Sequence, residues 1–272
     1  MKWLQTIQQQ FSQHKYAINA KQLGDDAELA WSNLGYWDDA TSSYPEACRQ
    51  LADQLAQAVD LTSNDRLLDL GCGQGASLLH WQQQYHVQHI EAVELQSSCV
   101  IQIQKHLPQI TAIHPHSFLN LKQIQFKSGF DVVLCIDAAY HSNLNSFLDS
   151  VGSVLNSKGR LGFHYLILSD QWLNLNSFQK KKYQWLLKAA DVNLNNLMTA
   201  SVLKQTLQSY DFEEIEIHDL SEEVLQGFAK YFQQLPQQTT DLDAFKIRMT
   251  AKLCAKLYAD GWVKYVQISA KK

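Results

Sequence analysis

Three alternating glycines directly after an apolar run constrain this chain more than any other feature. Residues 67–76 read LLDLGCGQGA, in which Gly71, Gly73 and Gly75 separate a strand-like run from a helix-like pattern that begins at Ala76. Glycine lets the backbone turn tightly and approach a ligand with no Cβ in the way. The segment therefore predicts a strand, a ligand-binding turn and a helix in succession. An ordinary tight turn between strand and helix is the alternative.

From residue 65 onward, short apolar runs alternate with helical patterns, which is typical of βαβ units in a mostly parallel sheet. Two later strand-like runs flank a helical stretch and are expected to pair antiparallel at one sheet edge. We expect strands at residues 66–70, 89–94, 110–114, 130–136, 160–168, 212–218 and 262–270, and helices at 76–84, 97–107, 143–155 and 221–259. Lys158 and Gly159 are expected to close the third helix, and Ser221 to cap the fourth.

Helical patterns outside this alternation indicate the domain organisation. Residues 1–44 predict an N-terminal helical lid with an amphipathic helix over 2–20, and residues 45–272 predict the α/β domain. Residues 169–209 follow the fifth strand and predict a helical cap that roofs a substrate pocket. Trp172 and Trp185 in this cap favour an apolar or amphipathic substrate, although packing of the cap on the core explains both equally well.

Composition excludes several classes of function. A net charge of -4 gives no general attraction to phosphate backbones, so we expect no nucleic-acid partner. The five cysteines form no CxxC pair, so neither a metal site nor a disulfide framework is expected. The polar start and the lack of a long apolar run predict a cytoplasmic protein. Trp172 and Trp185 together with the lysines at residues 180–182 could touch a membrane surface, but a single charge cluster is usually a solvated face, so membrane contact is the weaker expectation.

Asp69 decides between two interpretations of the glycine segment. With Ala76 in its last position the segment also fits the dinucleotide fingerprint GxGxxA, which would indicate an NAD-dependent oxidoreductase. A carboxylate at the strand end repels a pyrophosphate, but it accepts a charge-assisted hydrogen bond from an ammonium group. The combination resembles motif I of the class I S-adenosylmethionine-dependent methyltransferases. The resemblance extends over about residues 34–272.

This resemblance implies a doubly wound, seven-stranded, mostly parallel Rossmann-like sheet with an antiparallel last strand. It also implies that Asp69, Gly71, Gly73 and Gly75 hold the methionine end of the cofactor. Glu94, which ends the second strand, matches the acid that binds the ribose hydroxyls, and Leu95 would flank the adenine. Glu91, earlier in the same strand, is the weaker candidate for the ribose.

The adenine end of the site departs from the family pattern. Where the family usually has Gly-Asp-Ala after the third strand, this chain has His114-Pro115-His116-Ser117-Phe118. His116, Ser117 or the backbone is expected to contact the adenine in place of the missing Asp. A purely structural loop is the alternative.

The fourth strand leads into Asp137-Ala138-Ala139-Tyr140-His141, at the sheet edge where open α/β folds bind ligands. In similar methyltransferases, Asp137 and Ala138 would pass beside the cofactor sulfonium, and Tyr140 and His141 would border the substrate. His141 is a candidate general base, or else a helix-capping residue. The branch of the family that methylates DNA has Pro-Pro in this loop, which this chain lacks.

Aromatic residues elsewhere complete the expected site. Tyr36 and Trp37 lie in an Asn-Leu-Gly-Tyr-Trp segment that resembles the cofactor lid of enzymes that methylate sugars, sterols and quinone rings. His164, in the fifth strand, and Trp172, in the cap, are candidate substrate contacts. Core packing is the alternative for all four.

The sequence therefore predicts an enzyme that transfers a methyl group from S-adenosyl-L-methionine to a small, apolar or amphipathic acceptor, with S-adenosyl-L-homocysteine as the other product. No metal is expected, and no pattern indicates an oligomeric state. A non-catalytic S-adenosylmethionine-binding or regulatory protein is the main alternative, and an NAD-dependent oxidoreductase is a weaker one.

Overall fold

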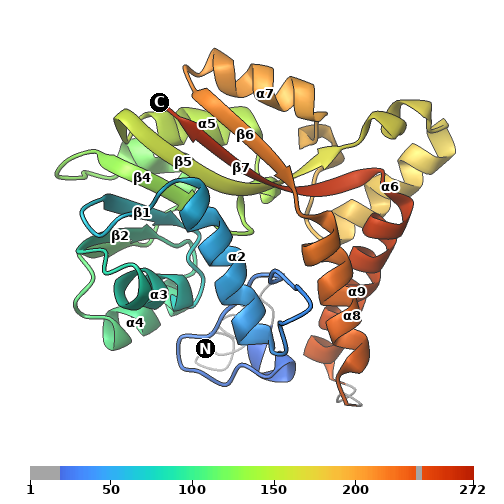
Figure 1. Cartoon of the computed structure of the whole chain (residues 1–272), viewed down its shortest axis with the longest axis horizontal. Coiled ribbons are helices and arrows are strands. Elements are labelled where there is room, and N and C mark those ends of the chain that lie inside the picture. The colour runs from blue at the N-terminus through green and yellow to red at the C-terminus, as the bar shows by residue number, and fades with distance from the viewer. Residues whose placement is uncertain (1–18, 237–240) are drawn as a thin grey trace, which may run out of the picture.

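The computed structural model describes residues 19–236 and 241–272 (Figure 1). The helix expected over residues 2–20 lies almost entirely outside the described residues. Residues 19–43 hold one short 3-10 helix, η1 (Ala20–Leu23), and otherwise irregular backbone. The described part of the expected N-terminal lid is therefore mostly loop.

A seven-stranded sheet forms the centre of the molecule, in the order β3-β2-β1-β4-β5-β7-β6. Strands β1 to β5 run parallel to one another, and β7 runs antiparallel to both β5 and β6. This confirms the predicted doubly wound sheet with an antiparallel last strand. The strands are β1 (Arg66–Leu70), β2 (His89–Val93), β3 (Ala112–His114), β4 (Phe130–Cys135), β5 (Leu155–Leu168), β6 (Glu213–Asp219) and β7 (Val263–Lys271).

Four α-helices of the described residues precede β5, and the three that connect strands lie close to where the sequence pattern puts them. The four are α2 (Tyr44–Ala58), α3 (Ala76–Gln84), α4 (Ser97–His106) and α5 (Leu144–Gly152). Strands β1 and β2 are buried over four consecutive residues each, which requires packing on both faces of the sheet. The carboxyl ends of β1, β2 and β4 consequently meet at one edge, beneath the irregular N-terminal segment.

The end of α5 differs from the prediction. The helix ends at Gly152, whereas Lys158 and Gly159 lie within β5. Leu155 pairs with Phe130 of β4, and the backbone N–H of Lys158 donates to the carbonyl of Lys272 at 2.7 Å. These pairings with β4 and the end of β7 draw residues 155–159 into the sheet, so the Lys-Gly pair marks an irregularity in a strand and does not end a helix.

The helical stretch between β6 and β7 is also divided differently. It comprises a π-helical segment η6 (Ser221–Gln226), α8 (Gly227–Gln234) and α9 (Leu242–Asp260). Ser221 is not the N-cap. Its hydroxyl donates to Oδ1 of Asp219 at 2.6 Å and accepts the backbone N–H of Tyr265 at 2.9 Å. The hydroxyl therefore joins the end of β6 to β7 and is not available to cap the helix.

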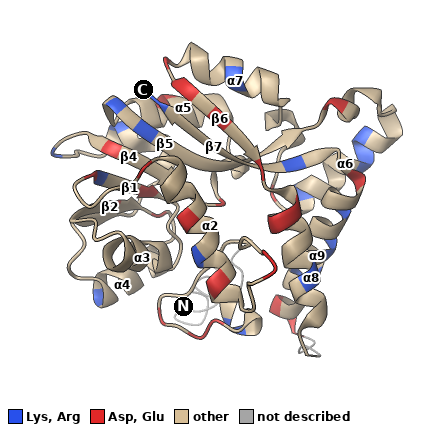
Figure 2. Ribbon diagram, in the orientation of Figure 1, with Lys and Arg blue, Asp and Glu red and all other residues tan. Residues whose placement is uncertain are grey.

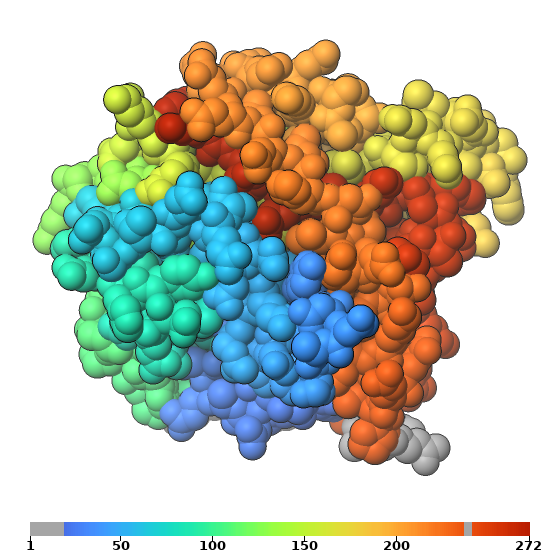
Figure 3. Space-filling model, in the orientation of Figure 1, coloured from blue at the N-terminus to red at the C-terminus, as the bar shows by residue number. Residues whose placement is uncertain are grey.

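The insert after β5 is helical, as predicted, with η4 (Asp170–Asn174), α6 (Ser177–Ala189), η5 (Leu194–Asn196) and α7 (Ala200–Ser209). Figure 1 shows α6, α8 and α9 together on one side of the molecule. Figure 3 shows the N-terminal segment, in blue, against α8 and α9, in orange and red, where the hydroxyl of Tyr231 donates to the carbonyl of Leu23. No helix among the described residues is both long and apolar enough to cross a membrane.

Candidate functional site

The turn between β1 and α3 has the backbone that its glycines predict. Gly71, Gly73 and Gly75 have φ of 71°, 55° and 92°, in the left-handed region that favours glycine. A Cβ on Gly73 would lie 2.8 Å from Oγ of Ser32, and one on Gly75 would lie 2.6 Å from Cγ1 of Ile103. The N-terminal segment and α4 therefore approach this turn too closely for any other residue type.

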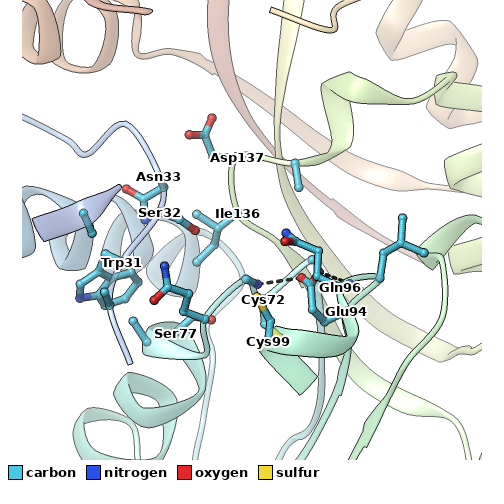
Figure 4. A pocket seen from close by; sticks show the side chains of 18 of the residues that line it. Trp31, Ser32, Asn33, Cys72, Ser77, Glu94, Gln96, Cys99, Ile136 and Asp137 are labelled. Carbon is cyan, nitrogen blue, oxygen red and sulfur yellow. Dashed lines mark hydrogen bonds between the residues drawn. The ribbon is translucent and has the colours of Figure 1, made fainter. Parts of the chain in front are cut away.

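A cavity of about 790 Å³ opens over this turn, at the carboxyl ends of β1, β2 and β4 (Figure 4). Its lining combines the glycine turn with the acids at the ends of neighbouring strands and with the N-terminal segment above them. The predicted site residues that line the cavity are Asp69, Gly71, Gly73, Glu94, Leu95, Ser117, Asp137, Ala138 and His141. The structure thus brings together in one cavity the residues expected from the sequence at the methionine, ribose and sulfonium parts of the cofactor.

Asp69 lines this cavity and is only 1% exposed. Its Oδ2 accepts a hydrogen bond from the indole N–H of Trp81 at 2.7 Å. Burial raises the pKa of Asp69 to about 6, against the opposing effect of hydrogen bonds from Trp81 and Ser77. A buried carboxylate with neutral donors is stabilised further by any cation that enters the cavity.

Glu94 lies across the turn from Asp69, and both of its oxygens are oriented by backbone. Oε2 accepts the N–H of Gly73 at 2.9 Å, and Oε1 accepts the N–H of Gln96 at 2.8 Å (Figure 4). Glu91 is instead paired with His114 at 2.9 Å and Arg66 at 3.7 Å, away from the cavity lining. Of these two acids, Glu94 is the one that lines the cavity.

Asp137 follows β4 with a φ of 52° and is held by three donors. Its Oδ1 accepts the hydroxyls of Tyr140 at 2.8 Å and Tyr265 at 3.0 Å, and Oδ2 accepts the backbone N–H of Leu34 at 2.9 Å. Burial raises the pKa of Asp137 to about 6, while these three hydrogen bonds act to lower it. The carboxylate is therefore fixed in position at the cavity wall.

The two histidines near this loop have different surroundings. Nδ1 of His141, at the cavity lining, lies 3.2 Å from the carbonyl oxygen of Asp191. Because a carbonyl only accepts, Nδ1 carries the proton and neutral His141 has its lone pair on Nε2. His164 is fully buried outside the lining and accepts the N–H of Asp137 on Nδ1 at 3.3 Å. Burial lowers the pKa of His164 to about 3, so it stays neutral.

The sequence profile of a family described as a methyltransferase domain matches residues 41–217 of this chain. The chain belongs to this methyltransferase family. The match covers β1 to β5, with the glycine turn, both acids of the cavity floor and Asp137. It confirms the family that motif I indicates.

Two individual proteins are also similar to the chain. Erythromycin 3''-O-methyltransferase of Saccharopolyspora erythraea is 32% identical over 167 residues, 57% of this chain and 52% of that protein. The aligned part of the chain thus spans about half the length of this relative. (+)-O-methylkolavelool synthase of Herpetosiphon aurantiacus is 23% identical over 272 residues, covering 92% of this chain and 90% of that protein.

Solved methyltransferase-fold structures superpose on almost the whole chain. A cyclopropane synthase of Mycobacterium tuberculosis has a TM-score of 0.74 at 17% identity, and covers 95% of this chain and 96% of its own. Geranyl diphosphate C-methyltransferase of Streptomyces coelicolor has a TM-score of 0.70 at 15% identity, covering 93% and 96%. At these identities the likeness shows a shared Rossmann-like fold.

Several residues expected at a methyltransferase site do not line the cavity. The indole N–H of Trp37 donates to the carbonyl of Leu34 at 2.9 Å, and its ring stacks on Tyr231 with centroids 4.2 Å apart. Trp172 packs edge-on against Tyr183 beneath α6. Packing therefore accounts for both tryptophans. The other predicted residues outside the lining are Tyr36, Gly75, His116, Tyr140 and His164, of which His116 is exposed to solvent.

Sequence reasoning missed part of the methyltransferase cavity. Trp31, Ser32 and Asn33, just before the Gly-Tyr-Trp segment, line it, and so do Phe118 and Leu119, just after Ser117. These residues adjoin the Gly-Tyr-Trp segment and Ser117, and this closeness in sequence was the signal that could have identified them. Asn19, Lys21, Asp191 and Asp243 reach the lining from distant parts of the chain, and no local pattern indicates them.

Proposed function

We propose that this chain transfers a methyl group from S-adenosylmethionine to a small, apolar or amphipathic acceptor. The observation that carries the proposal is Asp69, a buried carboxylate with a raised pKa that lines the cavity directly below the glycine turn. Such a group favours a cationic ligand. The pyrophosphate of a nicotinamide cofactor would meet the carboxylates of both Asp69 and Glu94 in this cavity.

The residues of the cavity fit this cofactor. Asp69 would accept hydrogen bonds from the ammonium of the methionine moiety, and Gly71 and Gly73 leave the space that its backbone needs. Glu94, oriented by two backbone N–H groups, would accept the two ribose hydroxyls. Leu95, Ser117, Phe118 and Leu119 form a mainly apolar end for the adenine. His116, an expected alternative to the family Asp, is exposed and outside this end.

S-adenosylmethionine, when bound, supplies an electrophilic methyl group. The role of the protein is to orient the acceptor and exclude water. Orientation alone can lower the activation barrier of a reaction by roughly 7–11 kcal/mol. Asp137, fixed by Tyr140, Tyr265 and Leu34, presents a negative charge where the sulfonium is expected, beside Ala138. His141 is proposed as the general base, because its Nε2 lone pair can take a proton from a hydroxyl or amine.

The acceptor class is supported by the relatives. Two of them are named for O-methylation, of erythromycin and of kolavelool, and one structural neighbour is named for C-methylation of geranyl diphosphate. These are small organic acceptors. Ser142 and Asp191 extend the cavity beyond His141, which gives an acceptor space next to the proposed base.

A thermal-unfolding comparison tests the cofactor. The full chain is heated with S-adenosylmethionine, S-adenosylhomocysteine or NAD, alongside Asp69→Ala and the exposed control Asp149→Ala. A ligand at about 100 times its Kd stabilises the folded state by about 2.7 kcal/mol, which moves the midpoint by several degrees. We expect shifts with the two adenosyl ligands only, reduced in Asp69→Ala and unchanged in the control. A shift with NAD alone would contradict the proposal.

Turnover tests the reaction itself. Methyl-labelled S-adenosylmethionine is incubated with the chain and a panel of hydroxyl-bearing terpenoids, glycosides and phenols, and label in organic extracts is counted. Transfer above the level of the heat-treated chain supports the enzyme. Cofactor binding without transfer to any member of the panel would favour the alternative of a non-catalytic binding protein.

A further inference from the structure

Helix α6 (Ser177–Ala189) exposes two large aromatic side chains on the same face as three lysines. Phe178 is 79% exposed and Trp185 is 67% exposed. Lys181, Lys182 and Lys188 are exposed as well, and their spacing from the aromatic residues follows the three- and four-residue period of a helix. We call these five residues the α6 face.

The opposite side of α6 is firmly packed, so the orientation of the helix is defined. Tyr183 and Leu187 are buried, and the Tyr183 hydroxyl donates to the carboxylate of Asp260. The Tyr183 ring contacts Trp172 and Trp262, with centroid distances of 5.8 and 4.9 Å. The exposure of Phe178 and Trp185 therefore follows from how the helix is anchored.

The charged side chains on helix α6 itself all have one sign. The helix carries four lysines and no acid, and none of these lysines forms an ion pair within 4.0 Å among residues 19–236 and 241–272 (Figure 2). Asp260, on the neighbouring helix α9, is close enough for Lys182 to help lower its pKa. Because the whole chain has a net charge of -4, this face is a positive region on a negative protein.

Aromatic side chains between lysines are the composition of a helix that lies in a membrane interface. Phe and Trp insert at the boundary of headgroups and acyl chains, while lysines contact anionic headgroups. Leu173, 72% exposed in the preceding η4, adds apolar surface next to the helix. A convex helix face with protruding rings suits insertion into a bilayer better than docking to a folded acidic partner, which would need a groove for them.

The α6 face also leads to the cavity. Helix α6 ends two residues before Asp191, which lines the cavity and whose carbonyl oxygen lies 3.2 Å from Nδ1 of His141. An amphipathic molecule held in a bilayer beneath α6 would therefore be close to the cavity wall.

We propose that the α6 face binds the surface of anionic lipid bilayers. Binding of the α6 face to a bilayer does not depend on the proposed methyl transfer. Only the idea that an acceptor is delivered from the bilayer rests on the proposed function. The arrangement departs from the expectation that favoured a solvated face over membrane contact, because the sequence did not show that Phe178 and Trp185 share one exposed face with the lysines.

Vesicle sedimentation tests this proposal with the full chain. Vesicles of phosphatidylcholine alone are compared with vesicles of phosphatidylcholine and phosphatidylserine at low and at raised salt. We expect binding to the mixed vesicles only, weakened by salt. Lys181→Glu/Lys188→Glu should weaken it by at least about 25-fold, since each lysine near an anionic surface contributes about fivefold. Phe178→Ser/Trp185→Ser should weaken it about tenfold with all lysines present.

A matched control separates the α6 face from general charge. Lys127→Glu/Lys204→Glu makes the same change in net charge at exposed lysines elsewhere and should bind like the wild type. No sedimentation of the wild type with mixed vesicles, or equal loss in the control, overturns the proposal. So does a wild-type dimer that both α6 variants dissociate, because the face would then bind a second copy. Thermal unfolding of each variant checks that it folds, and cofactor-induced shifts report on the methyltransferase proposal separately.

Discussion

Asp137 and Leu34 are 103 residues apart in the chain and are joined by a 2.9 Å hydrogen bond from the backbone N–H of Leu34 to Oδ2 of Asp137. The other carboxylate oxygen accepts the hydroxyls of Tyr140 and Tyr265. One side chain thus connects the N-terminal segment, the loop after β4 and the strand β7. Ionisation of this carboxylate strengthens the hydrogen bond that holds the N-terminal segment over the cavity.

Removing one of these donors should shift the acid limb of activity. In Tyr265→Phe, Asp137 loses a hydrogen bond that lowers its pKa, so the pKa should rise above about 6, by about one unit. Because protonation removes the negative charge of this carboxylate at the cavity and weakens the hydrogen bonds that it accepts, methyl transfer should fall as pH drops through this value. The measurement is kcat/KM between pH 5 and 8. Tyr85→Phe, which removes a hydroxyl bonded to Asp53, is the control, and an unchanged acid limb in Tyr265→Phe would refute the assignment.

Asp69→Asn should weaken cofactor binding without unfolding the chain. The amide oxygen can still accept the indole N–H of Trp81, but the charge that binds an ammonium is gone. Hydrogen bonds to charged groups contribute about 1.5–3 kcal/mol, so the Kd for S-adenosylmethionine should rise by roughly 10- to 150-fold. Titration calorimetry measures this, with Asp149→Asn as an exposed control. An equal Kd in wild type and Asp69→Asn would remove Asp69 from the site.

The same substitution should have the opposite effect on the cofactor-free protein. The pKa of Asp69 is raised in the folded state from 3.8 to about 6, so its contribution to stability is full below about pH 4 and is lost as pH rises through about 6. The loss corresponds to about 3 kcal/mol. Asp69→Asn lacks this loss and should be the more stable protein at pH 7.5. Urea unfolding from pH 4 to 8 measures the difference, and parallel curves for the two proteins would count against a raised pKa.

His141 should affect turnover more than cofactor binding. If its Nε2 takes the acceptor proton, His141→Ala and His141→Gln should lower kcat by about 10²- to 10⁴-fold. Shifts of the unfolding midpoint by S-adenosylhomocysteine should stay close to those of the wild type. Assays on the identified acceptor between pH 6 and 9 provide the measurement. Full turnover by His141→Ala across this range would reduce His141 to a residue that anchors the segment around Asp191.

Gly75→Ala should destabilise the chain for two separable reasons. Both Gly75 and Gly261 have a left-handed backbone, with φ of 92° and 64°, which costs a non-glycine residue about 1–3 kcal/mol. A Cβ at Gly75 would also lie 2.6 Å from Ile103, whereas one at Gly261 meets no atom within 4 Å. Thermal unfolding should therefore show a larger loss for Gly75→Ala than for Gly261→Ala. Equal losses would mean that Ile103 yields freely.

The sheet was predictable because its signals are local. Each buried strand is a short apolar run, and the three glycines fix the first connection, so β1 and α3 begin and end where the pattern indicates. Strand and helix ends were less predictable where long-range bonds decide them. The backbone bond of Lys158 to Lys272 determines that Lys158 lies in a strand. The bonds of Ser221 to Asp219 and Tyr265 determine that Ser221 does not cap a helix. The sequence pattern specifies none of these bonds.

The residues of the cavity were likewise predictable where local sequence signals place them and unpredictable where tertiary packing does. Asp69 and Glu94 end strands next to the glycine turn, so parallel pairing alone brings them together. Trp37 and Trp172 were aromatic residues near the site in sequence, but their faces are already occupied by Tyr231 and Tyr183. Asp191 and Asp243 reach the cavity only through the packing of helices after β5 and β6. Side chains placed by tertiary packing carry no periodic signal of their own.

The hydrogen bond from Trp81 to Asp69 gives the protein an internal optical reporter. The indole is completely buried, and its N–H is bonded at 2.7 Å to the carboxylate that faces the cavity. Indole emission responds to nearby charge, so neutralising that carboxylate, by a proton or by a bound cation, changes the colour of the light that Trp81 emits. Because the chain has seven tryptophans and Trp31 also lines the cavity, the part of the signal that comes from Trp81 is the difference between the emission of the wild type and that of Trp81→Phe.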